Sequence, residues 1–277
     1  MIPRDLAEKS TGEKEPMDLD KERFYRARIL QRRELTEDLW SIRIERNSEF
    51  RFVAGQYATL GVLAPHKHIE RPYSIVSSPY EPDLEFFLEL VPRGELTPAL
   101  HALRVGDEIT IRKAAKGRFT LAPDGATHQN HLLLCTVTGV APFVSYIRTF
   151  AAENRQNKTS GDRKLFVLEG ASRASEFGYI DELKRIAAEV SWLKYVPTVS
   201  RPWEDPGWSG EVGRVDDLIR EYAKVWGLTP ETTSVYACGH PKMIENATGI
   251  LARAGWHKDS VKSEVYFVPK EHVAVTT

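Results

Sequence analysis

The sequence has few cysteines and no long apolar run, and each of these two features excludes a class of protein. It has two cysteines, Cys135 and Cys238, among 277 residues. Two thiols cannot hold an iron–sulfur cluster, which takes four ligands that are usually all cysteine, and they argue against a disulfide framework. No apolar stretch approaches the roughly 20 residues that span a bilayer, and the N-terminus lacks the apolar core of a secretory signal. We therefore expect a cytoplasmic protein.

The chain also has little net charge. Its 38 basic and 39 acidic side chains give a net charge of −1 with histidine neutral. This balance favours neither nucleic acid nor a membrane surface as a partner. A hydrophobic fraction of 42% and a charged fraction of 28% are ordinary for a globular protein. The length suits two domains better than one.

Short β-type runs separated by turn residues fill the first half of the chain, after a polar and charged segment over 1–20 that we expect to be a flexible tail. Several short strands at this spacing predict an antiparallel β-barrel domain over 22–124, with one helical turn at 97–103. The expected strands cover 25–30, 39–44, 56–62, 73–76, 84–91 and 108–111.

Beyond Pro123-Asp124-Gly125, a predicted linker, apolar runs alternate with amphipathic segments. This alternation is typical of a parallel sheet covered by helices, and it predicts an α/β domain over 130–277. The expected strands cover 131–137, 164–168, 193–199, 234–237 and 261–267, and the expected helices cover 143–154, 179–190, 214–224 and 243–254.

A glycine turn joins the first strand and the first helix of the α/β half, at Thr138-Gly139-Val140-Ala141-Pro142. A helix N-terminus offers free N–H groups and a positive dipole end, which suit a pyrophosphate. Pro142 fits the start of such a helix. The same residues also fit a plain strand-to-helix turn that uses glycine for steric reasons. The six-residue glycine fingerprint of dinucleotide binding is not the pattern of this turn.

The barrel half contains Arg71-Pro72-Tyr73-Ser74, which combines three kinds of cofactor contact. Arginine can bind a diphosphate through paired hydrogen bonds, tyrosine offers an aromatic face and a hydroxyl, and serine offers a small hydrogen-bonding group. The residues also fit an edge strand whose tyrosine packs in the core, because Pro72 disfavours a central strand.

A second segment of the barrel half, Gly94-Glu95-Leu96-Thr97, opens the expected helical turn. It fits either a further diphosphate contact or a helix cap formed by Thr97. Leu88 and Leu90, in the expected strand 84–91, complete the cofactor contacts that we expect from the barrel half.

These segments, followed by Cys238-Gly239, resemble the plant-type ferredoxin–NADP⁺ reductase family in the same order and over roughly 24–270, nearly the whole chain. The resemblance implies an FAD-binding barrel followed by an NADP-binding α/β domain. The roles that it implies are Arg71 and 94–97 at the FAD diphosphate, Tyr73 at the flavin and ribityl chain, Ser74 near the hydride-accepting nitrogen, and Cys238 beside the nicotinamide.

The segment Glu264-Val265-Tyr266 resembles the acidic-x-aromatic ending of the plastid enzymes. That resemblance implies that the Tyr266 ring covers the flavin and that the Glu264 carboxylate helps protonation. The chain continues for eleven residues, and 267–270 resembles the tail of bacterial members. Tyr266 also fits a strand residue that faces the core.

The sequence departs from the family at one position of the phosphate loop. The family usually has glycine before the threonine of that loop, and this chain has Val137. A β-branched residue disfavours a positive φ. We therefore expect either an altered turn or an extended position that tolerates valine.

Three arginines, Arg173, Arg201 and Arg214, match the loops that bind the 2′-phosphate of NADP in bacterial members. The planar fork of arginine suits phosphate, although a single surface arginine is usually only solvated. Glu204 and Asp205 lie nearby and are acids of the kind that favours the unphosphorylated ribose of NADH. The resemblance implies NADPH, with NADH as the alternative.

The combined pattern predicts an FAD-dependent ferredoxin–NADP⁺ or flavodoxin–NADP⁺ reductase, monomeric and without a metal. Ser74, Cys238, Glu264 and Tyr266 are expected around the reacting atoms. An acidic carrier, ferredoxin or flavodoxin, would dock on the basic residues of 112–118, which also fit a solvated face. The alternatives are an NADH-dependent reductase component of an oxygenase and a non-catalytic flavin-binding or nucleotide-binding subunit of a larger complex.

Overall fold

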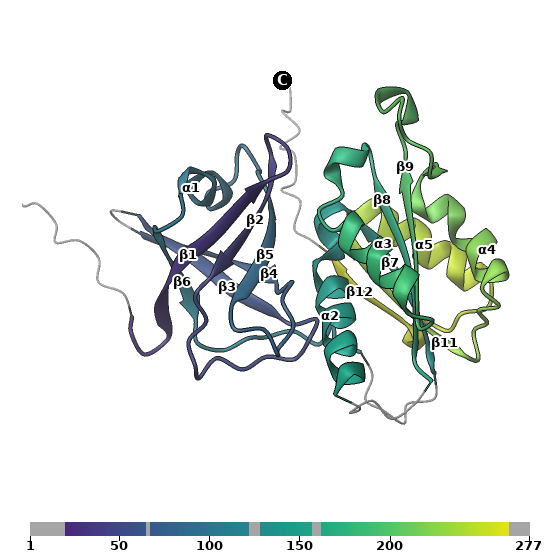
Figure 1. Ribbon diagram of the computed structural model, residues 1–277, viewed down its shortest axis with the longest axis horizontal. Helices are drawn as coiled ribbons and strands as arrows, with labels where there is room; N and C mark the ends of the chain where they lie inside the picture. The colour runs from purple at the N-terminus through teal and green to yellow at the C-terminus, as the bar shows by residue number, and fades with distance from the viewer. Residues whose placement is uncertain (1–19, 65–66, 122–127, 157–161, 266–277) are drawn as a thin grey trace, which may run out of the picture.

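The computed structural model describes residues 20–64, 67–121, 128–156 and 162–265. Two sheets, each with its own core, lie side by side in it (Figure 1). The predicted linker at 123–125, Tyr266, the extension 267–277 and almost all of the predicted tail lie outside the described residues. No helix in the described part of the chain is long and apolar enough to cross a bilayer.

The first domain is a six-stranded antiparallel sheet in the order β4-β3-β6-β1-β2-β5. Its elements are β1 (Phe24–Glu34), β2 (Leu39–Ile44), β3 (Tyr57–Ala64), β4 (Lys67–Ser74), β5 (Leu84–Glu89), α1 (Thr97–Ala102) and β6 (Glu108–Arg112). The sheet curls around a core that includes Trp40, Leu60 and Phe86. Just beyond β4, the Val76 amide donates to the Glu85 carbonyl at 2.9 Å, so the two edge strands approach each other. The predicted antiparallel barrel is confirmed as a curled half-barrel.

Strand β4 differs from the sequence prediction, which began a strand at residue 73. It begins at Lys67 and pairs with β3 as far as the partners Ser74 and Tyr57. Among the described strands β3 is its sole ladder partner, so Pro72 lies on an edge strand, where its missing N–H removes no ladder bond. The sequence prediction missed the start of β4 because its first residues are charged. An edge strand tolerates such residues.

The second domain is a six-stranded parallel sheet in the order β10-β9-β8-β7-β11-β12. This confirms the predicted α/β half. Its strands are β7 (Asn130–Thr136), β8 (Lys164–Ala171), β9 (Leu193–Val199), β10 (Glu211–Val212), β11 (Thr233–Gly239) and β12 (Val261–Val265). Its helices are α2 (Ala141–Arg155), α3 (Ile180–Glu189), α4 (Val215–Val225) and α5 (Pro241–Arg253).

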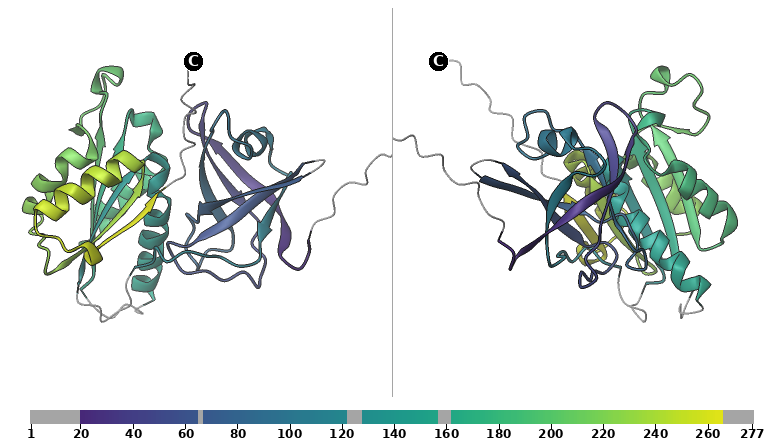
Figure 2. Two further views of the ribbon diagram at one scale, coloured as in Figure 1. Left: turned by 180° about the vertical axis from the view of Figure 1, so that it is seen from behind. Right: turned by 60° about the vertical axis from the view of Figure 1, so that its left-hand side comes forward.

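Side chains of the parallel sheet alternate between two helical layers. Leu133 and Cys135 of β7 pack with α2 and α3, whereas Leu132 and Leu134 pack with α4 and α5. The first of these layers also contacts the barrel, through residues such as Phe87. Seen from behind in Figure 2, β12 in yellow is the strand of the parallel sheet nearest to the barrel.

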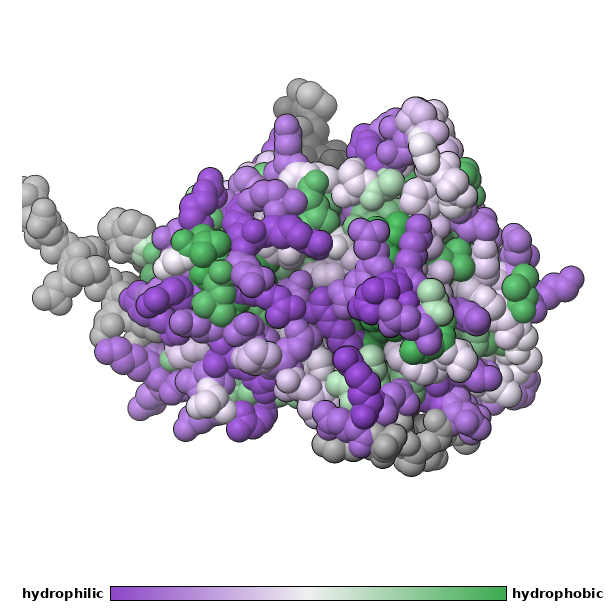
Figure 3. Space-filling model, viewed as in Figure 1, coloured by the Kyte–Doolittle hydropathy of each residue, from purple (hydrophilic) through white to green (hydrophobic). Residues whose placement is uncertain are grey.

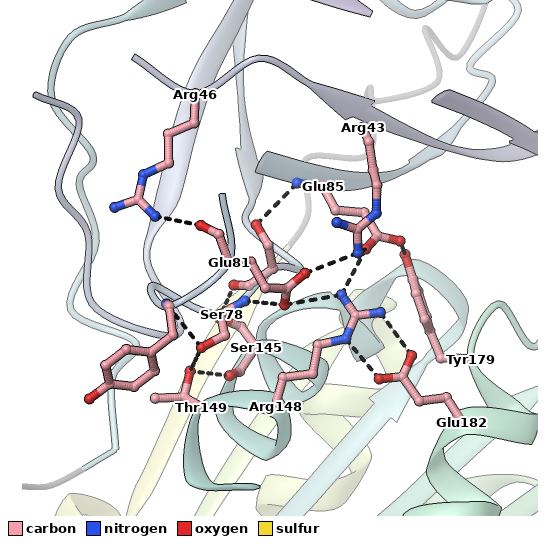
Figure 4. A network of polar contacts seen from close by, with 12 residues as sticks. Arg43, Arg46, Ser78, Glu81, Glu85, Ser145, Arg148, Thr149, Tyr179 and Glu182 are labelled. Atoms are coloured by element: carbon pink, nitrogen blue, oxygen red, sulfur yellow. Dashed lines mark hydrogen bonds and ion pairs between the residues drawn. The ribbon is translucent and has the colours of Figure 1, made fainter. Parts of the chain in front are cut away.

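The domains meet through a buried network of charged side chains (Figure 4). Arg148 of α2 lies 2.7 Å from Glu85 of β5 and makes two bonds of 2.8 Å to Glu182 of α3. Arg43 of β2 donates to the same Glu85 oxygen at 2.7 Å, and the Tyr179 hydroxyl donates to the other oxygen at 2.9 Å. Burial favours protonation of Glu85, but Arg148 and Arg43 outweigh it and lower the pKa of that carboxyl. The network therefore links the two domains through ionised groups.

This network forms part of the lining of a cavity of about 650 Å³ at the domain boundary. The cavity lies between β1 and β2 on one side and the start of α3 on the other. Hydrophilic side chains predominate on the face of the molecule that Figure 3 shows, and its hydrophobic patches are small and scattered.

Candidate functional site

Ser74 and Glu264 meet across the domain boundary. Ser74 ends β4 of the barrel, and its hydroxyl donates to Glu264 Oε2 of β12 at 3.3 Å. Burial raises the pKa of Glu264, and the hydrogen bond from Ser74 opposes that rise. A cavity of about 410 Å³ lies beside the pair, with Arg118 and Phe119 of the barrel and 262–264 of β12 in its lining. The arrangement can hold a proton on a carboxyl group at the junction of the two domains.

Cys238 lies next to Glu264 because β11 and β12 pair in parallel with these two residues in register. Cys238 is fully buried and belongs to the apolar layer that contacts the barrel. Three of the four expected reaction-centre residues, Ser74, Cys238 and Glu264, are thus brought together. Tyr266, the fourth, lies outside the described residues.

The expected phosphate loop of the α/β domain forms the short 3₁₀ helix η1 (Val137–Val140), which leads directly into α2. A Cβ on Gly139 would lie 2.3 Å from the Cys238 carbonyl oxygen, so only glycine fits there. A second contact joins the same two segments: the His240 amide, just after β11, donates to Oγ1 of Thr136, just before η1, at 2.9 Å. The loop and the end of β11 therefore hold each other in place, and Pro142 lies in the first turn of α2 as expected.

Val137 adopts the left-handed backbone conformation, with φ of 46°, and is the one non-glycine residue with a positive φ in the described chain. The alternative of an extended position is therefore wrong: valine occupies a conformation that suits glycine. Such a conformation costs about 1–2 kcal/mol for a residue with a Cβ. The half-buried side chain packs against the layer under α2 and α3 and against a small cluster that contains Phe177 and Val199, and this packing offsets part of that cost.

Arg71 and the 94–97 segment also converge. Arg71 Nη2 lies 3.3 Å from Glu95 Oε2, and Lys67 contacts the same carboxylate. All three side chains are about half exposed, which leaves them accessible to a ligand. The two segments that the resemblance assigns to one diphosphate are therefore neighbours, with a carboxylate between two cations.

Thr97 is not the helix cap that the sequence allowed. Leu96 occupies the cap position of α1, and no side chain caps the helix there. The buried Thr97 hydroxyl instead accepts from the Val91 amide at 2.9 Å. A Cβ on Gly94 would lie 3.0 Å from the Val91 carbonyl oxygen, so this turn is closely packed.

The other expected flavin contacts lie along β4 and β5. Pro72 is exposed and Tyr73 is half buried, and burial raises the pKa of Tyr73 to about 12 against the opposing effect of Arg71. Leu88 is buried in the barrel core, so any contact from it to a cofactor would come from its backbone. Leu90 packs at the edge of that core.

The three expected phosphate-binding arginines lie on adjacent loops at the carboxyl ends of β8, β9 and β10. Arg201 Nη1 lies 3.5 Å from Glu204 Oε1, and Arg173 contacts the other oxygen of Glu204. Arg214 Nε lies 3.3 Å from Asp216 Oδ1. The expected cations are thus present, with carboxylates between them.

The basic segment at 112–118 is partly neutralised. Arg112 forms a bidentate pair with Glu70, with Nε and Oε2 2.7 Å apart. Lys116 forms two backbone hydrogen bonds with Tyr57, and Arg118 reaches the lining of the cavity beside Glu264. The segment is therefore less cationic than its sequence suggests.

Two groups of interacting side chains were not predicted from the sequence. The network around Arg148 joins residues far apart in the chain, and no local pattern indicates it. Glu169 lies within the apolar run of β8 and is 0% exposed, with the Tyr195 hydroxyl donating to its Oε2 at 2.6 Å. Burial raises the pKa of Glu169 to about 8, against the opposing effect of Tyr195. The sequence signal that could have indicated Glu169 is an acidic residue inside an otherwise apolar strand.

Comparisons with known proteins follow the same division into domains. An oxidoreductase FAD-binding domain matches residues 27–121, and an oxidoreductase NAD-binding domain matches 133–248. The chain is 31% identical over 242 residues to a ferredoxin–NADP reductase of Pseudomonas aeruginosa. This alignment covers 84% of this chain and 90% of that protein. It is 32% identical over 200 residues to a flavodoxin/ferredoxin–NADP reductase of Escherichia coli, over 70% of this chain and 77% of that protein.

A solved structure agrees with these relatives. The crystal structure of a ferredoxin NADP⁺ reductase from Neisseria gonorrhoeae with bound FAD and NADP superposes with a TM-score of 0.75 at 27% identity. The match covers 88% of this chain and 99% of that chain, so it extends over both domains.

Proposed function

We propose a function from the premise that this chain belongs to the ferredoxin–NADP reductase family. It is an oxidoreductase of that type, with an FAD-binding domain followed by a nucleotide-binding domain. We infer that it exchanges electrons between NADPH and a ferredoxin or flavodoxin. The observation that carries the proposal is the contact between Ser74 and Glu264 across the domain boundary, with Glu264 in register with Cys238 on the neighbouring strand.

The barrel residues fit FAD. Arg71 and the 94–97 segment would hold the diphosphate, because they lie together at the surface and because the turn at Gly94 is closely packed. Tyr73 would contact the flavin, and Ser74 would lie near its reacting edge. When bound, FAD would supply the conversion between two-electron and one-electron transfer.

The α/β residues fit a nicotinamide dinucleotide. The N-terminus of α2 and the amides of η1 would hold the pyrophosphate, and Cys238 would lie beside the nicotinamide. Because Gly139 packs on the Cys238 carbonyl, the same loop fixes both contacts. The carboxyl group of Glu264, with its raised pKa, would hold or release a proton through the Ser74 hydroxyl as the reaction requires.

Arg173, Arg201 and Arg214 support NADPH as the nucleotide, since three guanidinium groups on adjacent loops suit the 2′-phosphate. The 2′-phosphate would have to displace Glu204 from Arg173 and Arg201. That carboxylate, with the neighbouring Asp205, favours a second candidate function, an NADH-dependent reductase component of an oxygenase.

The carrier would approach the cavity beside Glu264, where Arg118 offers a cation to an acidic surface. The test is steady-state turnover of purified full-length protein loaded with FAD, with NADPH as donor and either ferredoxin or flavodoxin as carrier to a final cytochrome acceptor. We expect turnover that depends on the carrier. Turnover with free flavin but with neither carrier would contradict the proposal, and faster turnover with NADH would support the second candidate.

A further inference from the structure

A row of protonatable side chains crosses the parallel sheet, from the reaction centre into the interior of the α/β domain. Glu264 of β12 is in register with Cys238 of β11, Cys238 with Cys135 of β7, and Cys135 with Glu169 of β8. Residues in register on parallel strands point to the same face of the sheet. This face is the one that α2 and α3 cover and that contacts the barrel.

Glu169 is the innermost member of the row and is an unusual group in an apolar sheet. Its side chain is 0% exposed, and one of its two oxygens accepts from Tyr195. The other, Oε1, has no hydrogen-bond partner among the described residues. A buried carboxyl group with an unpaired oxygen lowers the stability of the fold. Such a group in line with the reaction centre is therefore a candidate for function.

The other titratable groups near the row come from each element that packs against it. Cys135 from β7 and Tyr195 from β9 face Glu169 directly. From α3, Asp181 acts on Tyr195, and from α2, Tyr146 faces Cys238 and Glu264. Arg118 and Lys262 lie at the other end of the row, in the lining of the cavity beside Glu264. Within the described chain no cation acts on Glu169, whose pKa burial raises and the Tyr195 hydroxyl lowers.

We propose that Glu169 determines how strongly the site prefers oxidised over reduced nicotinamide. The inference deepens the proposed function and rests on its placement of the nicotinamide beside Cys238. The oxidised ring carries a positive charge and the reduced ring carries none. A carboxylate at Glu169 attracts the oxidised ring only, whereas the protonated carboxyl group distinguishes the two rings little.

The separation allows a measurable effect. Glu169 and Cys238 lie two strand spacings apart, about 10 Å. At an effective dielectric constant of about 20, one charge at that distance changes the affinity for a cationic ring on the order of tenfold. The change accompanies the loss of the proton from Glu169, whose pKa burial raises to about 8.

The experiment compares two ligands that differ in ring charge and share every phosphate. The dissociation constants of NADP⁺ and of 1,4,5,6-tetrahydro-NADP, whose ring is neutral, are measured on FAD-loaded full-length protein from pH 6.5 to 9 at constant ionic strength. We expect the affinity ratio to shift toward NADP⁺ on the order of tenfold as the pH rises through about 8. Glu169→Gln should hold the ratio at its low-pH value throughout.

Tyr195→Phe gives a second, directional test. It removes the hydroxyl that lowers the pKa of Glu169, so the shift in the ratio should move to higher pH. Glu189→Gln, on the exposed side of α3, is the matched control and should behave as the wild type. A ratio that stays flat with pH in the wild type, or that shifts equally in Glu169→Gln, overturns the inference.

Anaerobic mixing with NADPH separates this inference from the proposed function. If NADPH reduces the bound FAD while the ratio stays flat, only the role of Glu169 is overturned. If NADPH does not reduce the FAD, the placement of the nicotinamide is wrong and both are overturned. If Glu169→Gln does not fold, the wild-type profile and Tyr195→Phe still decide the matter.

Discussion

Arg148 and Glu85 form a buried ion pair between the two domains, with Nη1 and Oε2 2.7 Å apart and side chains 15% and 7% exposed. Glu85 belongs to β5, and its carbonyl accepts from Val76, two residues after Ser74. Arg148 belongs to α2, the helix that begins at the expected phosphate loop. The pair therefore connects the helix that follows this loop to the barrel. Its energetic importance follows from burial, because removing one partner of a buried pair leaves the other charge poorly compensated.

We expect Arg148→Ala to lower the free energy of unfolding by about 3 kcal/mol, the lower end of the usual range, because Arg43 and Tyr179 still contact Glu85. Urea denaturation of the FAD-loaded protein measures this. Arg185→Ala is the matched control: its ion pair with Glu189 is exposed and should contribute at most about 0.5 kcal/mol. Equal losses in the two variants would show that the domain contact is not coupled to stability.

Val137 provides a test of backbone strain. Val137→Gly removes the strain of a positive φ but also removes the packing of the side chain, whereas Val137→Ala keeps the strain and loses most of the packing. We therefore expect the glycine variant to be about 1 kcal/mol more stable than the alanine variant, as measured by thermal unfolding. At ordinary positions the order is the reverse. An alanine variant at least as stable as the glycine variant would contradict the left-handed conformation at this residue.

Glu169 should make stability fall as the pH rises. Its pKa is raised from 4.5 to about 8 in the folded chain, so between these values the folded protein holds a proton that the unfolded chain has lost. Stability therefore decreases with pH in that window, by at most about 1.4 kcal/mol per unit. Glu169→Gln should flatten the profile between pH 5 and 8, as followed by urea denaturation at each pH. A profile of the same slope in both proteins would assign the dependence to other groups.

Local patterning predicted much of the fold. The strands Leu39–Ile44 and Leu193–Val199 begin and end where their β-type residues do. By contrast, β4 was placed too late because its first residues are charged, and β10 was missed because it has only two residues. Edge strands and very short strands depend on their neighbours more than on their own composition.

The candidate site divides in the same way. Glycine and proline marked the turn at 138–142, which packs on Cys238, because such turns have local signatures. The placement of Ser74 and Glu264 around the same reacting atoms came from resemblance, since nothing local joins residues that far apart, and their direct hydrogen bond is a finding of the structure. The positive φ of Val137 was not predictable from valine itself, because a β-branched residue disfavours that conformation. The role assigned to Tyr266 stays a prediction.

Arg71 and Glu95 should have opposite effects on FAD binding. Arg71→Ala removes a charge-assisted contact to the diphosphate and should weaken FAD by about 1.5–3 kcal/mol. Glu95→Gln removes a carboxylate that lies 3.3 Å from Arg71 and should tighten FAD, because the diphosphate would no longer compete with it. Flavin fluorescence on dilution measures both, and chromatography of the released cofactor should show FAD. Recovery of FMN alone, or equal FAD affinity in the two variants, would contradict a diphosphate site at Arg71.

Arg201 and Glu204 should likewise act in opposite directions, here on nucleotide choice. Arg201→Ala should shrink the preference for NADPH over NADH, mainly through the KM for NADPH, because the 2′-phosphate is remote from the reacting atoms. Glu204→Gln should enlarge that preference, since it removes the negative charge that Arg173 and Arg201 share. The ratio of kcat/KM for the two nucleotides measures both effects. If Glu204→Gln instead lowers kcat/KM for NADH and leaves that for NADPH unchanged, the carboxylate binds the ribose hydroxyls. That outcome would contradict a phosphate site in this loop and support an NADH-dependent enzyme.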